Sequence, residues 1–517
     1  MVARAHRSRT DFVPPNPRQA TAYYAFTVFA SSAILLVLEI VAGRLIAPYV
    51  GASLYTWTSI IGVILGGLSL GNWLGGRLAD RGAGPVTAGV VLLLSGLAAL
   101  AILWVLTLVA PLLQASRLGL LSISFLFVAT LFFLPALGLG VITPLLTTLA
   151  LALDARTGQV VGRMHALAAL GSILGTFVTG YWLVQQFGSR VIVLGSGVVL
   201  IMLAVPLLAR RGRFALLGAT VGAVVLVAVA RANNGLTSPC DVESAYFCIR
   251  VVDDSQAAPW GEARTLVLDH LVHGINHRQE PRLLVAPYVQ LIDELIGQSL
   301  DTGAGEAFFY AGGGAYTLPR ALRADHPRAT HVVAELDPAV TLTAEAALFL
   351  DPDGLEILHQ DARVALWHQP ASHFDSVISD VFHDLSVPYH LLTQEYFSLA
   401  HSRLKPGGLL VMNVVDAWPD AHLVASVLDT LRSVFTNADA WLEEAPAGGL
   451  RHTFVLAASD SPLPEGRITA RRGLPRRWQP VGMRLAAVAR GDRELLRDDY
   501  VPVERLLAPL LLTEMGR

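Results

Sequence analysis

The chain has 517 residues, of which 53% are hydrophobic and only 15% are charged. That length exceeds one ordinary domain, and that apolar content excludes a wholly soluble protein. The net charge of -3 and the lack of a basic stripe exclude a nucleic-acid-binding protein.

Residues 1–22 are polar and arginine-containing, which is typical of a cytoplasmic tail and not of a signal peptide. Residues 23–231 then carry long apolar runs, each close to or above the roughly 20 residues that a helix needs to cross a bilayer. We count about seven such runs and predict an integral membrane domain embedded in a lipid bilayer. Pro135 and Pro144 lie in the fourth run, so a kinked helix and a helix with a re-entrant piece both stay open. The runs cover residues 24–47, 57–76, 86–110, 118–149, 160–187, 191–208 and 214–230.

The placement of arginines predicts the orientation, because cytoplasmic loops carry the positive excess. The amino-terminal tail and alternate turns hold most arginines, whereas the opposite loops hold only Arg117, Arg190 and Arg231. With seven crossings, the amino terminus lies inside and everything after residue 231 lies on the outer face. Cys240 and Cys248 would then meet an oxidising compartment, where they are either two free thiols or one disulfide.

The second apolar run carries glycines at helical spacing, which predicts close helix packing. These are Gly62, Gly66, Gly67, Gly71, Gly75 and Gly76. In the first run, Glu39 is an acid at membrane depth with Arg44 about one turn later. A structural ion pair and a functional role for Glu39 both stay open.

After about residue 240 the composition is that of a soluble domain. Residues 240–300 predict a β-hairpin region with strands at 246–252 and 264–269, followed by a helix at 283–300. Residues 301–460 alternate strands and helices, which predicts a Rossmann-like α/β domain with a parallel sheet. Residues 461–517 form a tail that packs on the domain or on the membrane surface. The strand candidates are 307–310, 331–335, 355–359, 376–379, 409–415 and 452–457.

Polar groups follow four of these strands, at the sheet edge where ligands bind in such folds. The glycines at 312–314 let a ligand approach the backbone amides. Glu335 is an acceptor suited to ribose hydroxyls, and Asp337 beside it is expected to cap the next helix. Asp361 can accept a hydrogen bond from an adenine amino group, and Asp380 places an acid at the centre of the strand ends.

The order of these motifs resembles the polyamine aminopropyltransferases, the spermidine and spermine synthases, over about residues 244–456. The resemblance is greatest to the bacterial branch in which such a domain follows a block of membrane helices, and this implies a multi-pass protein of the bacterial inner membrane. Single motifs are shared with S-adenosylmethionine-dependent methyltransferases, so a fold of that transferase type is expected. The motifs are Gly312-Gly313-Gly314, Glu335-Leu336-Asp337-Pro338, Asp361-Ala362, Asp380 and Leu404-Lys405-Pro406-Gly407-Gly408.

The resemblance implies a site for decarboxylated S-adenosylmethionine as co-substrate, or for S-adenosylmethionine itself, and no metal. Asp380 corresponds to the base that deprotonates a polyamine or another small amine. Tyr288, His383 and Asp384 are expected to contact that amine. The resemblance also allows a homodimer. The residues expected to bind the donor are Gly312, Gly313, Gly314, Glu335, Asp361, Ala362 and His273.

The chain also departs from the family pattern. Ala315 and Tyr316 stand where soluble members usually carry an acid, and His273 stands where a glutamine is usual. Two other functions stay open: an S-adenosylmethionine-dependent methyltransferase, and a non-catalytic transporter or sensor of polyamines or related cations. Glu39 is the residue that a transport pathway would use.

Overall fold

The computed structural model describes residues 16–116, 118–154, 156–208, 213–256, 261–299, 305–381, 388–444, 451–488, 492–508 and 510. The chain forms two compact units. One holds most of the residues up to Ser238, and the other holds Pro239–Arg517.

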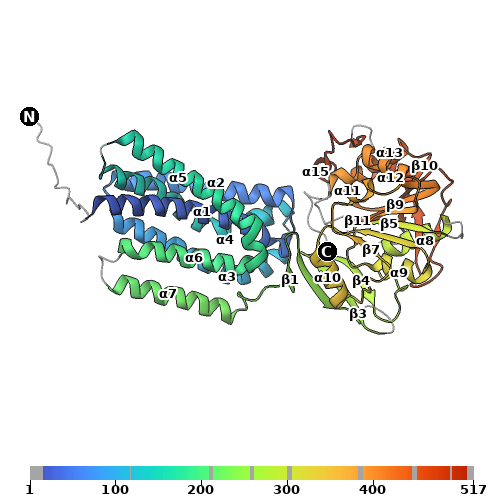
Figure 1. Cartoon of the computed structure of the whole chain (residues 1–517), viewed down its shortest axis with the longest axis horizontal. Coiled ribbons are helices and arrows are strands. Elements are labelled where there is room, and N and C mark those ends of the chain that lie inside the picture. The colour runs from blue at the N-terminus through green and yellow to red at the C-terminus, as the bar shows by residue number, and fades with distance from the viewer. Residues whose placement is uncertain are drawn as a thin grey trace, which may run out of the picture. The chain divides into compact units, whose positions relative to one another are not determined.

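The first unit consists of helices that lie side by side (Figure 1). Among the described residues, five helical segments are long and apolar enough to cross a membrane: Pro17–Val50, Leu54–Asp80, Pro85–Gln114, Leu120–Leu151 and the continuous segment Thr157–Leu208. That segment has 52 residues and contains a π-helical stretch, Thr179–Leu183, and non-helical backbone at Gly188. All seven predicted apolar runs fall on helices, while the number of membrane crossings stays a prediction. The helices are α1 (Pro17–Val50), α2 (Leu54–Asp80), α3 (Pro85–Gln114), α4 (Leu120–Leu151), α5 (Thr157–Val178), α6 (Val184–Leu208) and α7 (Arg213–Ala232).

Three of the glycines in α2 bring this helix close to α4. A Cβ atom at Gly71 would lie 2.2 Å from the carbonyl oxygen of Leu137, and one at Gly75 would lie 2.6 Å from Pro144. A Cβ atom at Gly67 would lie 3.0 Å from the Cβ of Ala136. The predicted close packing is therefore confirmed for Gly67, Gly71 and Gly75. The glycines at 62, 66 and 76 have no atom within 4 Å of such a Cβ and lie outside this contact.

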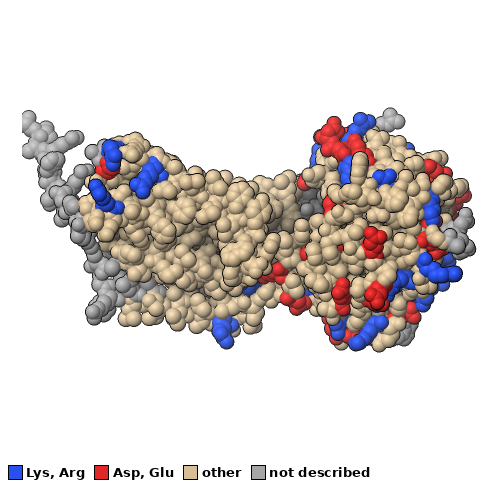
Figure 2. All heavy atoms as spheres, in the orientation of Figure 1, with Lys and Arg blue, Asp and Glu red and all other residues tan. Residues whose placement is uncertain are grey.

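Charged side chains are sparse in the helical unit and gather mainly at one end of it (Figure 2). The same end holds the start of α1, the end of α2 with Arg77, and the connection between α4 and α5 with Arg156. At this end Arg156 forms an exposed ion pair with Asp154 at 2.9 Å. Between the ends, the face seen in Figure 2 is almost free of charge, as expected for helices that contact lipid.

The second unit is built on a nine-stranded mixed sheet with the order β12-β13-β10-β11-β9-β8-β5-β6-β7. The five strands from β5 to β9 are parallel and correspond to the first five predicted strands. They are β5 (Ala307–Ala311), β6 (Thr330–Ala334), β7 (Glu356–Leu358), β8 (Phe374–Ser379) and β9 (Leu404–Ala417). All five residues of β5 are buried, because helices cover both faces of the sheet.

The prediction of a parallel sheet is wrong for the last predicted strand. This strand is β11 (Arg451–Ser459), and it pairs antiparallel with β9 and with β10 (Asn437–Glu443). The reason is that β10 and β11 are consecutive strands joined by a short connection, and such a connection permits only an antiparallel pair. The apolar run in β11 reports burial and carries no information on direction.

Helices cover both faces of this sheet (Figure 1). One face carries α8 (Pro287–Ser299), α9 (Thr317–Asp325) and α10 (Pro338–Ala347). The other carries α11 (Ala362–Trp367), α12 (Gln394–Arg403) and α13 (His422–Arg432). The core between the layers contains fully buried aromatic side chains, among them Phe308, Tyr310, Trp441 and Trp478.

A separate four-stranded antiparallel sheet precedes the large one. It consists of β1 (Val242–Glu243), β2 (Cys248–Asp253), β3 (Ala263–Leu268) and β4 (Leu271–His277). The two predicted hairpin strands coincide with β2 and β3, while β4 was missed because it mixes polar residues and a glycine with its apolar ones. Cys240 and Cys248 form a disulfide at the start of this sheet. Of the two alternatives left open by the sequence, the structure thus contains the bonded pair.

Part of the predicted tail packs on the sheet. Strands β12 (Ile468–Thr469) and β13 (Arg477–Pro480) join its edge next to β10. Arg471 donates from its backbone amide and guanidinium to Glu294 of α8, whose side chain is fully buried. Two short helices follow, α14 (Gly482–Leu485) and α15 (Val503–Leu506). Residues 468–480 therefore belong to the domain and are not a loose tail.

Candidate active site

The candidate site lies at the carboxyl ends of the central parallel strands. Strand β5 lies between β8 and β6, and the chain reverses its direction of progress across the sheet at this point. Such a reversal leaves a crevice beyond the strand ends, because the connections leave in opposite directions. Four predicted groups come together here: the glycine turn after β5, Glu335 after β6, Asp361 after β7 and Asp380 after β8.

The glycine turn is bonded to the chain's own carboxylate. Gly312 has a φ of 92°, and a Cβ there would lie 2.3 Å from the carbonyl oxygen of Asp380, so no other residue fits. The amides of Gly313 and Gly314 donate to Oε2 of Glu335 at 2.9 and 3.1 Å. Oε1 accepts from the amide of Asp337 at 2.9 Å. Burial raises the pKa of Glu335, while these three amides act in the opposite direction.

The residues after the glycines are part of the packing around the site. Tyr316 is fully buried at a φ of 57°, and its hydroxyl contacts Thr341 Oγ1 at 2.6 Å. Ala315 packs closely against Gly274 of β4. A Cβ added to Gly274 would lie only 2.5 Å from the Cβ of Ala315. The Cβ of Ala315 thus lies at the contact with β4, at the place where the family pattern has an acid. The departure from the pattern is therefore matched by the way β4 packs on the turn.

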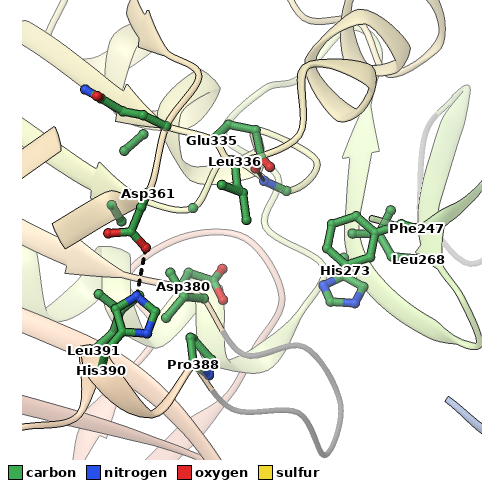
Figure 3. A pocket seen from close by; sticks show the side chains of 16 residues that line it. Phe247, Leu268, His273, Glu335, Leu336, Asp361, Asp380, Pro388, His390 and Leu391 are labelled. Carbon is green, nitrogen blue, oxygen red and sulfur yellow. Dashed lines mark hydrogen bonds and ion pairs between the residues drawn. The ribbon is translucent and has the colours of Figure 1, made fainter. Parts of the chain in front are cut away.

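Asp361 has both of its oxygens bonded. Oδ1 caps α11 by accepting from the amides of Arg363 and Val364, at 2.9 and 3.1 Å. Oδ2 contacts Nε2 of His390 at 2.7 Å (Figure 3). This bond to His390 is the main reason why the pKa of Asp361 is lowered. This part of the pocket wall thus presents a carboxylate–imidazole pair.

Asp380 receives one donor on each oxygen. Asn413 donates from Nδ2 to Oδ1 at 2.8 Å, and the hydroxyl of Tyr288 donates to Oδ2 at 3.3 Å. The surrounding protein excludes most of the water, and this desolvation raises the pKa of Asp380 to about 6, against the effect of the two hydrogen bonds. A carboxyl group of this kind is still ionised at neutral pH but is a better proton acceptor than an ordinary aspartate.

These groups line one pocket with a volume of about 280 Å³ (Figure 3). Its walls contain most of the residues predicted from the sequence: Gly312, Gly314, His273, Glu335, Asp361, Ala362 and Asp380. Gly313 and Tyr288 are not in the wall, but each donates a hydrogen bond to a wall residue, Gly313 to Glu335 and Tyr288 to Asp380. His383 and Asp384 lie outside the described residues. Sequence reasoning did not assign the apolar wall formed by Phe247, Leu268, Leu336 and Leu391.

Asn413 was also missed. It lies in β9 within the apolar run Leu409-Leu410-Val411-Met412-Asn413-Val414-Val415. A single polar side chain in a buried strand needs a partner, and that is a signal which the sequence does contain. Among the described residues, no group of three or more His, Cys, Asp or Glu side chains is placed to hold a metal ion.

Comparisons with known proteins agree with the motif order. No family model matches the chain. A probable polyamine aminopropyl transferase of Bifidobacterium longum is 27% identical over 147 residues, which are 28% of this chain and 32% of that protein. Polyamine aminopropyltransferase 2 of Pseudomonas aeruginosa is 28% identical over 206 residues, covering 38% of this chain and 56% of its own length. The polyamine aminopropyltransferase of Nitrosomonas europaea is 30% identical over 175 residues, which are 32% of this chain and 50% of that protein.

The chain therefore spans between about a third and somewhat more than half of the length of these relatives. Among solved structures, a probable spermidine synthase from Corynebacterium glutamicum covers 50% of this chain and 95% of its own, with a TM-score of 0.43 and 20% identity. The resemblance read from the motifs is confirmed by the sequence relatives. Over part of its length, this chain is related to the polyamine aminopropyltransferases.

Proposed function

We propose that the protein is a membrane-anchored transferase of the aminopropyltransferase type. It transfers an aminopropyl group from decarboxylated S-adenosylmethionine to a polyamine or another small amine. The observation that carries this proposal is the ionised, partly desolvated carboxylate of Asp380 in the pocket wall, held by two donors beside the glycine turn. The sequence relatives named polyamine aminopropyltransferase support it.

The pocket offers a place for each part of the nucleoside donor. Oε1 of Glu335 accepts one amide and has a lone pair left for a ribose hydroxyl. The resemblance assigns the adenine to Asp361 and Ala362, which line the same pocket. The glycine turn and His273 line the wall on the side of β4. The apolar wall suits a thioether and the faces of a base, since neither needs a hydrogen-bond partner there.

Asp380 acts as the base. The amine nitrogen attacks the carbon next to the sulfonium, the new bond is nitrogen to carbon, and the carbon–sulfur bond breaks. The sulfur leaves as a neutral thioether with the bonding electrons, and the proton of the amine passes to Asp380. A pKa of about 6 suits this step, because the group is ionised at pH 7 and still takes up a proton readily. His383 and Asp384 stay predicted contacts of the amine.

We place the protein in a bacterial inner membrane, with its amino terminus in the cytoplasm. The five long apolar helical segments and the arginines at one end of the helical unit support this. Seven crossings would leave the second unit on the outer face. The disulfide between Cys240 and Cys248 is in keeping with that side, since disulfides persist in oxidising compartments.

The disulfide also favours a second candidate, a non-catalytic sensor or transporter. Nucleoside donors of this kind are cytosolic, so a domain on the outer face would rarely meet one. The second unit would then be a binding module for polyamines or related cations, served by Glu39 in α1, which is half-buried. Uptake of a labelled polyamine that is unchanged in Glu39→Gln would contradict a transport role.

Binding and transfer measurements with the purified full chain test the first proposal. We expect calorimetry to detect binding of methylthioadenosine and decarboxylated S-adenosylmethionine, the latter tighter than S-adenosylmethionine. Asp380→Asn should lower the transfer rate by about 10²–10⁴-fold, whereas the exposed control Asp353→Asn should leave it unchanged. The proposal fails if neither nucleoside binds and Asp380→Asn has no effect on any transfer. Tighter binding of S-adenosylmethionine would favour a methyltransferase.

A further inference from the structure

Asn413 lies level with Asp380 in the sheet. Strands β8 and β9 are parallel neighbours, and Ser379 pairs with Met412, so the next residues on each strand are side by side. On its other side Asn413 pairs with Val455 of β11. Its side chain is only 5% exposed and points to Asp380, with 2.8 Å between Nδ2 and Oδ1.

Burying an asparagine at this position costs folding free energy. Its neighbours in β9 are apolar and fully buried, and a leucine or valine there would continue the strand. Its own Oδ1 is buried without a hydrogen-bond partner among the described residues. A buried polar group without a partner costs about 1–3 kcal/mol, so the contact with Asp380 is its one evident use in this part of the chain.

We propose that Asn413 is a positioning residue which holds the Asp380 carboxylate in its ionised form and aims its free lone pairs at the attacking amine. The proposal rests on the proposed function of Asp380 as the base. The donor on Oδ1 fixes the rotation of the carboxyl plane, because Tyr288 holds only the other oxygen and at a longer distance. An N–H donor also stabilises the charged form relative to the protonated form.

The direction of the effect follows from this contact. The hydrogen bond from Asn413 lowers the pKa of Asp380 against the larger effect of burial. Without it, the carboxyl group stays buried and loses one of its two donors, so its pKa rises above the present value of about 6. The base is then protonated over a wider range of pH, and the reaction slows most at the acidic end.

The pH dependence of the transfer rate tests the proposal in Asn413→Leu, and in Asn413→Val should the leucine variant not fold. We expect the acidic limb of kcat to move upward by about one pH unit, which corresponds to a rate loss of about fivefold at pH 6 that approaches tenfold at pH 5 and vanishes toward pH 9. The KM for the donor should stay unchanged. Met412→Leu is the matched control, since Met412 is fully buried on the same strand.

A second readout does not depend on activity. The carbonyl stretch of protonated Asp380 can be identified in infrared difference spectra by its absence in Asp380→Asn, and it can be titrated in the purified full chain. We expect a midpoint near pH 6 in the wild type and in Met412→Leu, and a higher midpoint in both Asn413 variants. Equal midpoints, or a rate loss that is the same at every pH, would overturn the role of Asn413. A shifted midpoint without any transfer activity would instead overturn the proposed function.

Discussion

The three acids of the pocket differ in chemistry because their neighbours differ. Glu335 accepts from three backbone amides and is fixed at the turn. Asp361 is tied to His390, and this contact lowers its pKa. Asp380 has two neutral donors and little water, and its pKa is raised. Three carboxyl groups in the same small space thus differ in hydrogen bonding and in the direction of their pKa shifts, and under the proposed function they also differ in role.

Replacing His390 tests the pair with Asp361. His390→Ala removes the bond that keeps the pKa of Asp361 low, so Asp361 takes up a proton at a higher pH than in the wild type. As the pH is lowered from about 6 to about 4, we expect the affinity for methylthioadenosine to fall at a higher pH in His390→Ala than in the wild type. Calorimetry measures this affinity. The exposed His368→Ala is the control. Parallel curves for both variants would show that Asp361 does not contact the ligand.

Asp416 is a further buried acid and is not among the residues that line the pocket. It accepts from the amide of Ala417 at the end of β9 and from that of Val424 in the first turn of α13, and burial raises its pKa to about 7. Its pKa in the unfolded chain is lower, about 3.9, so the folded state binds the proton more tightly. The contribution of Asp416 to stability is therefore fully present below about pH 4 and is lost as the pH rises to about 7.

Asp416→Asn should weaken this pH dependence. The variant cannot titrate, so its melting temperature should fall less than that of the wild type between pH 5 and pH 8. At pH 5 it should be the less stable protein, because one amide at α13 loses its acceptor at a cost of about 1–3 kcal/mol. Asp420→Asn, at an exposed position, should follow the wild type. Melting curves that shift in parallel for all three proteins would contradict the assignment.

At the residue level, the sequence predicts the site where a strand end determines it. Glu335, Asp361 and Asp380 follow strands that are recognisable as apolar runs, and parallel strands bring their ends together. Asn413 reaches Asp380 from the interior of β9, and His390 reaches Asp361 from the short 3-10 helix Tyr389–Leu391 that follows β8. Their proximity depends on strand order and on loop path, which the sequence does not state locally.

At the level of elements, the glycines of α2 separate two faces of one helix. Gly67, Gly71 and Gly75 recur every four residues and meet α4, whereas Gly62, Gly66 and Gly76 meet nothing within 4 Å. The sequence predicts close packing from the glycines as a group. It does not tell which of them face the partner helix, because both sets have helical spacing.

Two alanine variants distinguish the two faces. Gly71→Ala places a Cβ at 2.2 Å from the carbonyl oxygen of Leu137, so α2 and α4 must separate. We expect a loss of about 1–3 kcal/mol in stability, seen as a lower melting temperature of the detergent-purified protein. Gly62→Ala is the matched control on the same helix and should be neutral or slightly stabilising, by up to about 1 kcal/mol. Equal effects of the two variants would be inconsistent with the packing.

The strands show the same limit. Each of β5 to β9 is apolar and followed by a turn or a helix start, so its existence can be predicted. β10 (Asn437–Glu443) begins with alternating polar residues and β13 has four residues, and neither is recognisable. The antiparallel direction of β11 depends on its pairing with β10, so missing one strand led to the wrong direction for the next.

At the scale of the whole molecule, the side of the membrane decides between the two candidate functions. The helical unit carries its arginines mainly at one end, and the second unit starts with a disulfide. Both observations favour an outer location, yet a cytosolic donor favours an inner one. The sequence alone leaves this open because it depends on the parity of the crossings.

Thiol labelling of intact cells measures the side directly. On the outer face, a membrane-impermeant maleimide should label Cys240 and Cys248 only after treatment with an impermeant reductant, since the two are bonded. Cys240→Ser should make Cys248 reactive without reductant, to the extent that its burial allows; Cys248 is 4% exposed, so denaturation after quenching is needed as a reference. Labelling that requires lysis of the cells would place the second unit in the cytoplasm and remove the main support for the sensor.

The hydrogen bonds between Glu335 and the glycine turn bear on which nucleotides can bind in the pocket. Amides at such a turn are the donors with which dinucleotide-binding proteins hold phosphate groups. Here the amides of Gly313 and Gly314 are already taken by a carboxylate of the chain, whose negative charge repels a phosphate. ATP or NAD would bring a phosphate to the amides that the Glu335 carboxylate already occupies. We therefore expect the turn to disfavour a nucleoside that carries a phosphate at its 5′ end and to tolerate one that is neutral or cationic there.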